Sequence, residues 1–227
     1  MQIQKLQLYT HRLAGQRQFY TQTLGLPLRE DSPTAFAVQA GSTRLRFEEV
    51  ERQHYYHFAF NIPPFQYEEA LEWLRARVPL LRDGDTELID FSNWNAYAMY
   101  FEDPGGNILE FIARRDIDAP SPSTFGPDRL LSISEIGLSV ASVEAAFAKI
   151  NAAAAVPFYS GNRENFCAAG DPEGLFIIVD HNNKEWYPTG RPARFFPLTV
   201  QFSENGQPYQ LQLTANGPQL HRLTPPA

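Results

Sequence analysis

Residues 100–110, YFEDPGGNILE, constrain the fold of this chain more than any other segment. Asp103 and Pro104 predict the start of a tight turn, because Pro presets φ near about −65° and Asp hydrogen-bonds to the backbone that follows. The glycines and Asn107 after them tolerate the positive φ that closes such a turn. Alternation along the returning strand then places Glu110 between apolar neighbours. Burying a carboxylate costs several kcal/mol, so Glu110 is expected to have a partner or a function.

This turn resembles a motif of the vicinal oxygen chelate superfamily, which includes glyoxalase I, extradiol dioxygenases, fosfomycin-resistance transferases and bleomycin-resistance proteins. Two other segments support the resemblance: residues 19–25, FYTQTLG, are similar to the end of the family's first helix, and residues 57–63, HFAFNIP, to the strand that opens its second module. The resemblance covers roughly residues 1–115. It implies an α+β fold in which paired βαβββ modules form a concave mixed sheet, as in glyoxalase. It does not specify the chemistry, because one fold hosts many activities.

Hydrophobic periodicity predicts two modules in residues 1–115. The first module, residues 1–52, is expected to contain a strand at 3–9, a helix at 13–24 and strands near 26–29, 35–39 and 43–48. The second module, residues 53–115, is expected to contain a strand at 55–62, a helix at 63–78 and strands near 87–90, 96–101 and 107–114.

The rest of the chain predicts a third, partial module after a linker. Three prolines mark residues 116–129 as that linker. Residues 130–227 then predict a strand at 131–140, a helix at 141–153, a strand at 175–179 and a C-terminal hairpin. The hairpin joins strands at 198–202 and 209–213, and its Asn205-Gly206 pair is typical of a two-residue turn. No complete fourth module is expected.

Composition argues against several classes of partner. The net charge is −7 and no basic cluster is present, which argues against binding to nucleic acid or an anionic membrane. No apolar run approaches the roughly 20 residues of a membrane span. The N-terminus lacks the apolar core of a signal peptide and Cys167 is the single cysteine, so a cytoplasmic protein is expected.

The resemblance implies a ligand site at four positions, on the first and last strands of the paired modules. It places Lys5 and Arg46 there in the first module, opposite His57 and Glu110 in the second. His57 and Glu110 are the candidate metal ligands, because the family's three-ligand members use two histidines and a glutamate. Lys5 stands where the other histidine is expected, and neither ammonium nor guanidinium offers a lone pair. The two cations therefore favour a groove without a tightly bound metal ion. The alternative is a groove that binds Fe²⁺, Mn²⁺, Zn²⁺ or Ni²⁺. In the metal-free groove, Lys5 is expected to occupy the place of the ion and to pair with Glu110.

Further candidate residues follow from alternation and from the resemblance. The third unit has its matching positions at Glu135 and Ile178. Candidate binding residues on the concave face, in the long loop of the second module and on the strand before the turn are Gln7, Tyr9, Arg46, Asn61, Trp94 and Tyr100.

Three functions are compatible with these residues. The first is a glyoxalase-like or dioxygenase-like enzyme, a lyase, isomerase or dioxygenase, that acts on a small oxygenated molecule of anionic or aromatic character. Its candidate catalytic residues are Glu110, His57, Lys5 and Tyr100. The second is a metal-free ligand-binding protein of the bleomycin-resistance type. The third is a chain whose groove is vestigial and whose C-terminal half-module forms an assembly surface; a homodimer is expected. The sequence favours the first two and does not choose between them.

Overall fold

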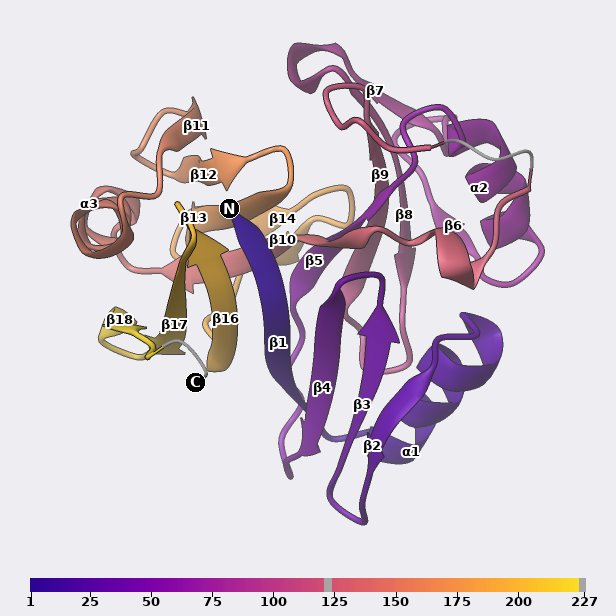
Figure 1. Cartoon of the computed structure of the whole chain (residues 1–227), viewed down its shortest axis with the longest axis horizontal. Coiled ribbons are helices and arrows are strands. Elements are labelled where there is room, and N and C mark those ends of the chain that lie inside the picture. Colours follow the sequence, from indigo (N-terminus) through magenta and orange to yellow (C-terminus); the bar gives the residue numbers. More distant parts are fainter. Residues whose placement is uncertain (121–123, 225–227) are drawn as a thin grey trace.

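The computed structural model describes residues 1–120 and 124–224. The linker prediction at residues 121–123 and the last part of the C-terminal prediction, residues 225–227, lie outside these. The described chain folds into two large mixed sheets with three helices of six residues or more (Figure 1). The predicted α+β fold of βαβββ modules is confirmed. No helix in the described ranges is long and apolar enough to cross a lipid bilayer.

The first module and the C-terminal strands form a seven-stranded sheet, in the order β18-β17-β16-β1-β4-β3-β2. Its strands are β1 (Gln2–Thr10), β2 (Leu28–Asp31), β3 (Ala35–Ala40), β4 (Thr43–Glu49), β16 (Leu198–Glu204), β17 (Gln207–Thr214) and β18 (Gly217–Arg222). The helix α1 (Leu13–Gln18) continues as a π-helical turn, Phe19–Thr23, where the sequence predicted one helix over 13–24.

The second and third modules form a nine-stranded sheet, in the order β11-β12-β13-β10-β5-β9-β8-β6, with β7 also paired to β8. Its strands are β5 (His57–Ile62), β6 (Leu80–Leu81), β7 (Ile89–Phe91), β8 (Ala96–Glu102), β9 (Ile108–Arg114), β10 (Ser132–Val140), β11 (Phe158–Gly161), β12 (Phe166–Asp171) and β13 (Gly174–Asp180). Its helices are α2 (Tyr67–Arg75) and α3 (Val143–Ala154), and short 3₁₀ turns occur at Ser92–Trp94 and Pro127–Arg129. The two-residue strands β14 (Glu185–Trp186) and β15 (Arg191–Pro192) pair with each other beyond β13.

The modules pair differently from the expectation. The first two were expected to share one groove, but β5 of the second module pairs with β10 of the third, and β1 of the first pairs with β16. The third unit is also complete rather than partial, because β10, α3 and β11 to β13 supply all its elements. The physical reason is that each opening strand offers the same antiparallel edge, and alternation within a strand does not identify its partner across modules.

The C-terminal strands are a fourth unit without a helix. A helical crossover makes the first and last strands of a module parallel, as in the β1–β4 and β5–β9 pairs. The last unit lacks this crossover, so β16, β17 and β18 form an antiparallel meander instead. Asn205 (φ 50°) and Gly206 (φ 72°) form the predicted two-residue turn. β16 covers the edge of β1 within the chain, and β18 and β2 are the outer strands of this sheet, so the assembly surface and the homodimer stay predictions.

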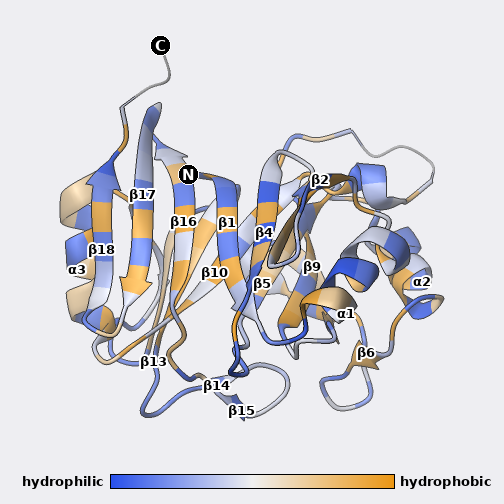
Figure 2. Ribbon diagram, turned by 90° about the horizontal axis from the view of Figure 1, so that it is seen from below, coloured by the Kyte–Doolittle hydropathy of each residue, from blue (hydrophilic) through white to orange (hydrophobic). Residues whose placement is uncertain are grey.

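The core lies between the two sheets. One contiguous group of buried apolar side chains includes residues of both sheets and all three helices. Phe176 of the nine-stranded sheet and Phe202 of the seven-stranded sheet meet there with ring centroids 5.1 Å apart. Hydrophilic and hydrophobic bands alternate along β17, β16, β1 and β4 in Figure 2, as expected for strands with one buried face. Each sheet therefore turns its other face away from the shared core.

The Asp103 turn joins the family-like motifs of the first two modules. The Asp103 carboxylate accepts hydrogen bonds from the backbone of Gly105 (2.9 Å) and Asn107 (3.0 Å). It also accepts from the side chains of Asn107 (2.7 Å), Gln16 (2.8 Å) and Tyr20 (2.7 Å). Burial raises the pKa of Asp103, and these hydrogen bonds offset that effect only in part. Hydrogen bonds to Asp103 therefore connect the turn of residues 103–107 with Gln16 and Tyr20 of the first module.

Asp103→Ala is expected to lower the free energy of unfolding by about 3 kcal/mol, because it leaves several buried donors without an acceptor. Equilibrium denaturation in urea measures this. Asp118→Ala, at an exposed position, is the matched control and should change stability by less than about 0.5 kcal/mol. Equal stability of the two variants would contradict the structural role of Asp103.

Candidate functional site

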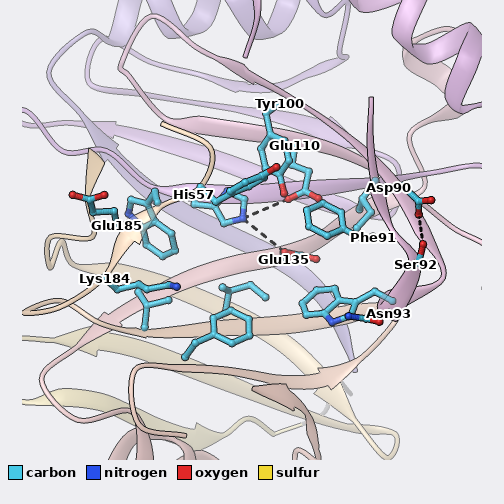
Figure 3. Close-up of a pocket in the computed structure, with 17 residues that line it drawn as sticks. His57, Asp90, Phe91, Ser92, Asn93, Tyr100, Glu110, Glu135, Lys184 and Glu185 are labelled. Carbon is cyan, nitrogen blue, oxygen red and sulfur yellow. Dashed lines mark hydrogen bonds and ion pairs between the residues drawn. The ribbon is translucent and has the colours of Figure 1, made fainter. Parts of the chain in front are cut away.

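Three buried polar side chains meet on the face of the nine-stranded sheet that points away from the core. His57 opens β5, Glu110 lies on β9 and Glu135 lies on β10. Only 2–6% of each residue is exposed. His57 Nε2 lies 3.6 Å from Glu110 Oε2 and 3.7 Å from Glu135 Oε2 (Figure 3). One ligating atom from each of the three lies within 4.8 Å of the other two.

The strand register explains why these residues converge. Ala59 of β5 is paired with Glu110 on one side and with Glu135 on the other. Successive positions on one face of a strand are two residues apart, so His57 lies next to Ala59 on that face. The methyl group of Ala59 leaves room for both carboxylates above the central strand.

Surrounding groups fix the orientation of His57. Its Nδ1 contacts the Ile108 carbonyl at 3.2 Å, which leaves Nε2 directed at the two carboxylates. The Trp186 ring lies against the imidazole, with centroids 5.4 Å apart, and Tyr100 stacks on it at 6.2 Å. Gly137 makes room for the indole, because a Cβ there would lie 2.5 Å from Trp186 Cη2. A carbonyl partner on one ring nitrogen is the usual way that proteins orient a metal-binding histidine.

Arg114 distinguishes the two carboxylates from each other. Its guanidinium is 1% exposed and forms an ion pair with Glu135. Burial alone would raise the pKa of Glu135, but the charge of Arg114 and hydrogen bonding with His57 outweigh it and lower that pKa. For Glu110, burial and the nearby Glu135 carboxylate outweigh the Tyr100 hydrogen bond and the more weakly felt Arg114 charge, and they hold the pKa of Glu110 well above its usual range.

A cavity of about 470 Å³ opens over this cluster. His57, Glu110 and Glu135 lie among its lining residues, together with aromatic and aliphatic walls: Phe91, Trp94, Tyr100, Ile112, Phe166, Ile177, Val179, Trp186 and Tyr187. Burial and the Glu110 and Glu135 carboxylates raise the pKa of Tyr100, so its hydroxyl stays protonated at neutral pH. The indole N–H of Trp186 has no acceptor within the described ranges. A mostly apolar pocket with a few convergent polar groups is typical of a small-molecule site.

The structure separates the predicted site residues into three groups. His57, Glu110, Tyr100 and Trp94 line the cavity. Asn61 lies at the far end of β5, where its amide donates to the Pro172 carbonyl (3.0 Å) beside a separate cavity of about 180 Å³.

The other predicted residues lie on the seven-stranded sheet. Lys5, Gln7 and Tyr9 share the outer face of β1, and Arg46 of β4 forms ion pairs with Glu30 and Glu48. The predicted pairing of Lys5 with Glu110 is therefore wrong, because these residues belong to different sheets.

Lys5 is the counterpart of Glu135 on this second sheet. Lys5 pairs with Gln201, which pairs with Gln210, just as Glu135 pairs with Ala59 and Ala59 with Glu110, although β16 and β17 are antiparallel whereas β5 and β9 are parallel. In both sheets a register shift directly precedes the first of these residues. Lys5 and Gln210 thus have the positions on the seven-stranded sheet that Glu135 and Glu110 have on the nine-stranded sheet.

Several residues that line the cavity were not predicted as site residues. Glu135 had been assigned the matching position of the third unit, but its meeting with His57 depends on the β5–β10 pairing. Ile177, and not Ile178, lines the cavity, while Ile178 is buried in the core. Trp186 and Lys184 also line the cavity from the segment after β13. No periodicity in that segment marks them as site residues.

Two solved structures resemble the chain over nearly its entire length. A protein from Bacillus subtilis described as a candidate dioxygenase matches with a TM-score of 0.62 and 14% identity, over 100% of this chain and 86% of that chain. A glyoxalase I variant from Zea mays matches with a TM-score of 0.60 and 11% identity, over 97% of this chain and 93% of that chain. No protein-family model and no curated protein sequence matches the chain. The chain therefore has the same fold as these two proteins, which is the fold that the sequence resemblance implied.

Proposed function

We propose that this protein is a metal-dependent enzyme that acts on a small molecule bound through neighbouring oxygen atoms. The observation that carries the proposal is the cluster of His57, Glu110 and Glu135, whose ligating atoms lie within 4.8 Å of one another beneath the cavity. The sequence-based argument against a metal depended on Lys5 at a ligand position. That argument no longer applies, because Lys5 lies on the other sheet.

The donor set fits a divalent ion. One imidazole nitrogen and two carboxylates suit Mn²⁺, Fe²⁺ or Zn²⁺, since carboxylate oxygens favour harder cations and imidazole favours the later metals. Ile177, which pairs with Gly137 in β10, offers no donor on the strand beyond Glu135. Three protein ligands with the remaining positions open towards a cavity is the arrangement of a catalytic site rather than a structural one.

The surrounding residues would control how a substrate binds. When bound, an ion of this kind supplies Lewis-acid polarisation of a substrate oxygen. Arg114 holds the Glu135 carboxylate in place, and the Ile108 carbonyl holds the His57 ring. The Tyr100 hydroxyl donates a hydrogen bond to Glu110 and so helps to hold that carboxylate, and the Trp186 ring packs against His57. The aromatic walls exclude water, which strengthens each of these electrostatic interactions.

A second candidate is the metal-free ligand-binding protein of the bleomycin-resistance type. One observation favours it: both carboxylates already have partners in the protein, because Arg114 forms an ion pair with Glu135 and His57 Nε2 lies 3.6 Å from Glu110 and 3.7 Å from Glu135. The cavity would then bind its ligand by shape and hydrogen bonding alone. The two candidates differ in whether the purified protein takes up a stoichiometric ion.

Calorimetric titration of chelator-treated protein with Mn²⁺ or Zn²⁺ tests the proposal. One ion per chain is expected for the wild type, and His57→Gln should bind at least about 100-fold more weakly, because a ligand is lost outright. Lys5→Ala is the control and should match the wild type, since Lys5 lies on the other sheet. Uptake by His57→Gln equal to that of the wild type would contradict the site. No uptake by the wild type would favour the metal-free candidate.

A further inference from the structure

The charges around the cavity are distributed unevenly. Of the described residues that line it, Lys184 alone carries a fixed positive charge, while four lining residues are acidic: Asp90, Glu110, Glu135 and Glu185. Glu110 and Glu135 lie at the buried end of the cavity with His57. Lys184 belongs to the exposed segment between β13 and β14. In Figure 3 its ammonium extends towards the interior of the cavity, whereas the Glu185 carboxylate points away from it.

The backbone of Lys184 is held on both sides. Its N–H donates to the Asp180 carbonyl at 2.9 Å, and its own carbonyl accepts from Ala193 N–H at 2.9 Å. The Asp180 carboxylate in turn accepts from the backbone of Asn182 (2.9 Å) and the side chain of Asn183 (2.7 Å). This turn fixes where the lysine side chain begins, so the reach of its ammonium is limited to one region of the cavity.

The Lys184 ammonium has no ion-pair partner within residues 1–120 and 124–224; it lies 6.0 Å from the centre of the Phe166 ring. An ammonium offers three donors and no acceptor, so the group that satisfies it must be an acceptor. The walls between it and the buried cluster are mainly aromatic and aliphatic. Lys184 itself is exposed, so its attraction for an opposite charge strengthens where a bound apolar ligand and these walls exclude water.

We propose that Lys184 determines specificity by binding a carboxylate at one end of a flat, apolar substrate whose neighbouring oxygens face the His57–Glu110–Glu135 cluster. This proposal rests on the proposed function, because it uses the cluster as the second anchor. A single ammonium matches the single charge of a carboxylate. A dianionic phosphate fits less well, because one ammonium leaves its second charge unbalanced and Asp90 also lines the cavity.

Two probes of nearly equal size test the proposal: protocatechuate, a dihydroxybenzoate, and its uncharged amide. Both present two adjacent hydroxyls, and they differ in the charge at the opposite end. Calorimetry on the full chain loaded with Zn²⁺, which is not redox-active, gives both affinities. The wild type is expected to bind the carboxylate probe about tenfold more tightly than the amide. Lys184→Met should bring this ratio to about one, and Lys184→Arg should keep most of it.

Lys149→Met is the matched control. It removes the same charge from an exposed position on α3, and it should leave the tenfold ratio unchanged. A preference that persists in Lys184→Met, or equal affinities in the wild type, would overturn the role of Lys184. Zinc uptake without binding of either probe would overturn the substrate class. Absence of zinc uptake would count against the proposed function itself, so the two failures are distinguishable.

Discussion

Glu110→Gln is expected to weaken Mn²⁺ or Zn²⁺ binding by at least about 100-fold and, in the metal-free protein, to raise the free energy of unfolding by about 1–2 kcal/mol. The first effect follows because an amide oxygen is a far weaker ligand than a carboxylate. The second follows from the burial of Glu110 and Glu135 side by side, with Arg114 paired to Glu135.

The stability effect has a definite electrostatic origin. At neutral pH the folded protein must either hold two buried carboxylates together or take up a proton at Glu110. Both cost free energy relative to the unfolded chain, in which the glutamate is ionised in water. Glutamine removes this cost and retains nearly the same shape. A residue that destabilises the folded chain but is needed for a ligand is typical of a functional site.

Urea denaturation with a chelator present measures the stability change, and calorimetry measures the affinity. Glu49→Gln, at an exposed position on β4, is the matched control and should change neither quantity. A Glu110→Gln protein that is less stable than the wild type would show that Glu110 is mainly a structural residue. Metal binding equal to that of the wild type would remove Glu110 from the donor set.

Arg114→Met is expected to lower the free energy of unfolding by about 3–5 kcal/mol. Arg114 is buried and pairs with Glu135, so its loss leaves the Glu135 carboxylate without its cation, beside Glu110 and with little access to water. Methionine retains most of the packing volume, including the contact near the Trp94 ring, which lies 5.4 Å from the guanidinium carbon. The expected loss is therefore electrostatic.

The double variant Arg114→Met/Glu135→Leu separates the charge effect from packing. Removal of both partners leaves no unpaired charge from this pair, so the double variant should recover most of the stability lost in Arg114→Met. Thermal and urea denaturation measure both variants. A single variant as stable as the wild type would contradict a buried, paired Arg114. A double variant no more stable than Arg114→Met would attribute the loss to packing.

The local features of the fold follow from the sequence, whereas the pairing of its modules does not. The Asp103 turn, the Asn205-Gly206 hairpin and the order of strands within modules are set by neighbouring residues, and local chemistry predicts them. The choice between β5 with β1 and β5 with β10 depends on which edges meet after folding. The first strands of the modules have similar hydrophobic alternation, so their own residues do not determine which of them pair. In the structure Lys5 and Arg46 lie on the other sheet, whereas Glu135 lines the cavity.

Strand periodicity predicts some of the remaining site residues but not others. Arg114 lies on the same face of β9 as Glu110, two alternations further along, so strand parity identifies it once the strand is known to extend that far. Lys184 and Trp186 enter the cavity from a turn and a two-residue strand. The tertiary contact between Trp186 and Gly137 explains the position of the indole, and hydrophobic periodicity does not predict such a contact.

A crystal soaked with Mn²⁺, with anomalous diffraction data that locate the ion, tests the central claim most directly. The predicted result is one anomalous peak per chain, within about 2.0–2.3 Å of His57 Nε2 and of one oxygen each from Glu110 and Glu135. A peak only at another position, such as the outer face of the seven-stranded sheet, would contradict the account. So would a fully ordered His57–Glu110–Glu135 cluster without any peak at saturating Mn²⁺.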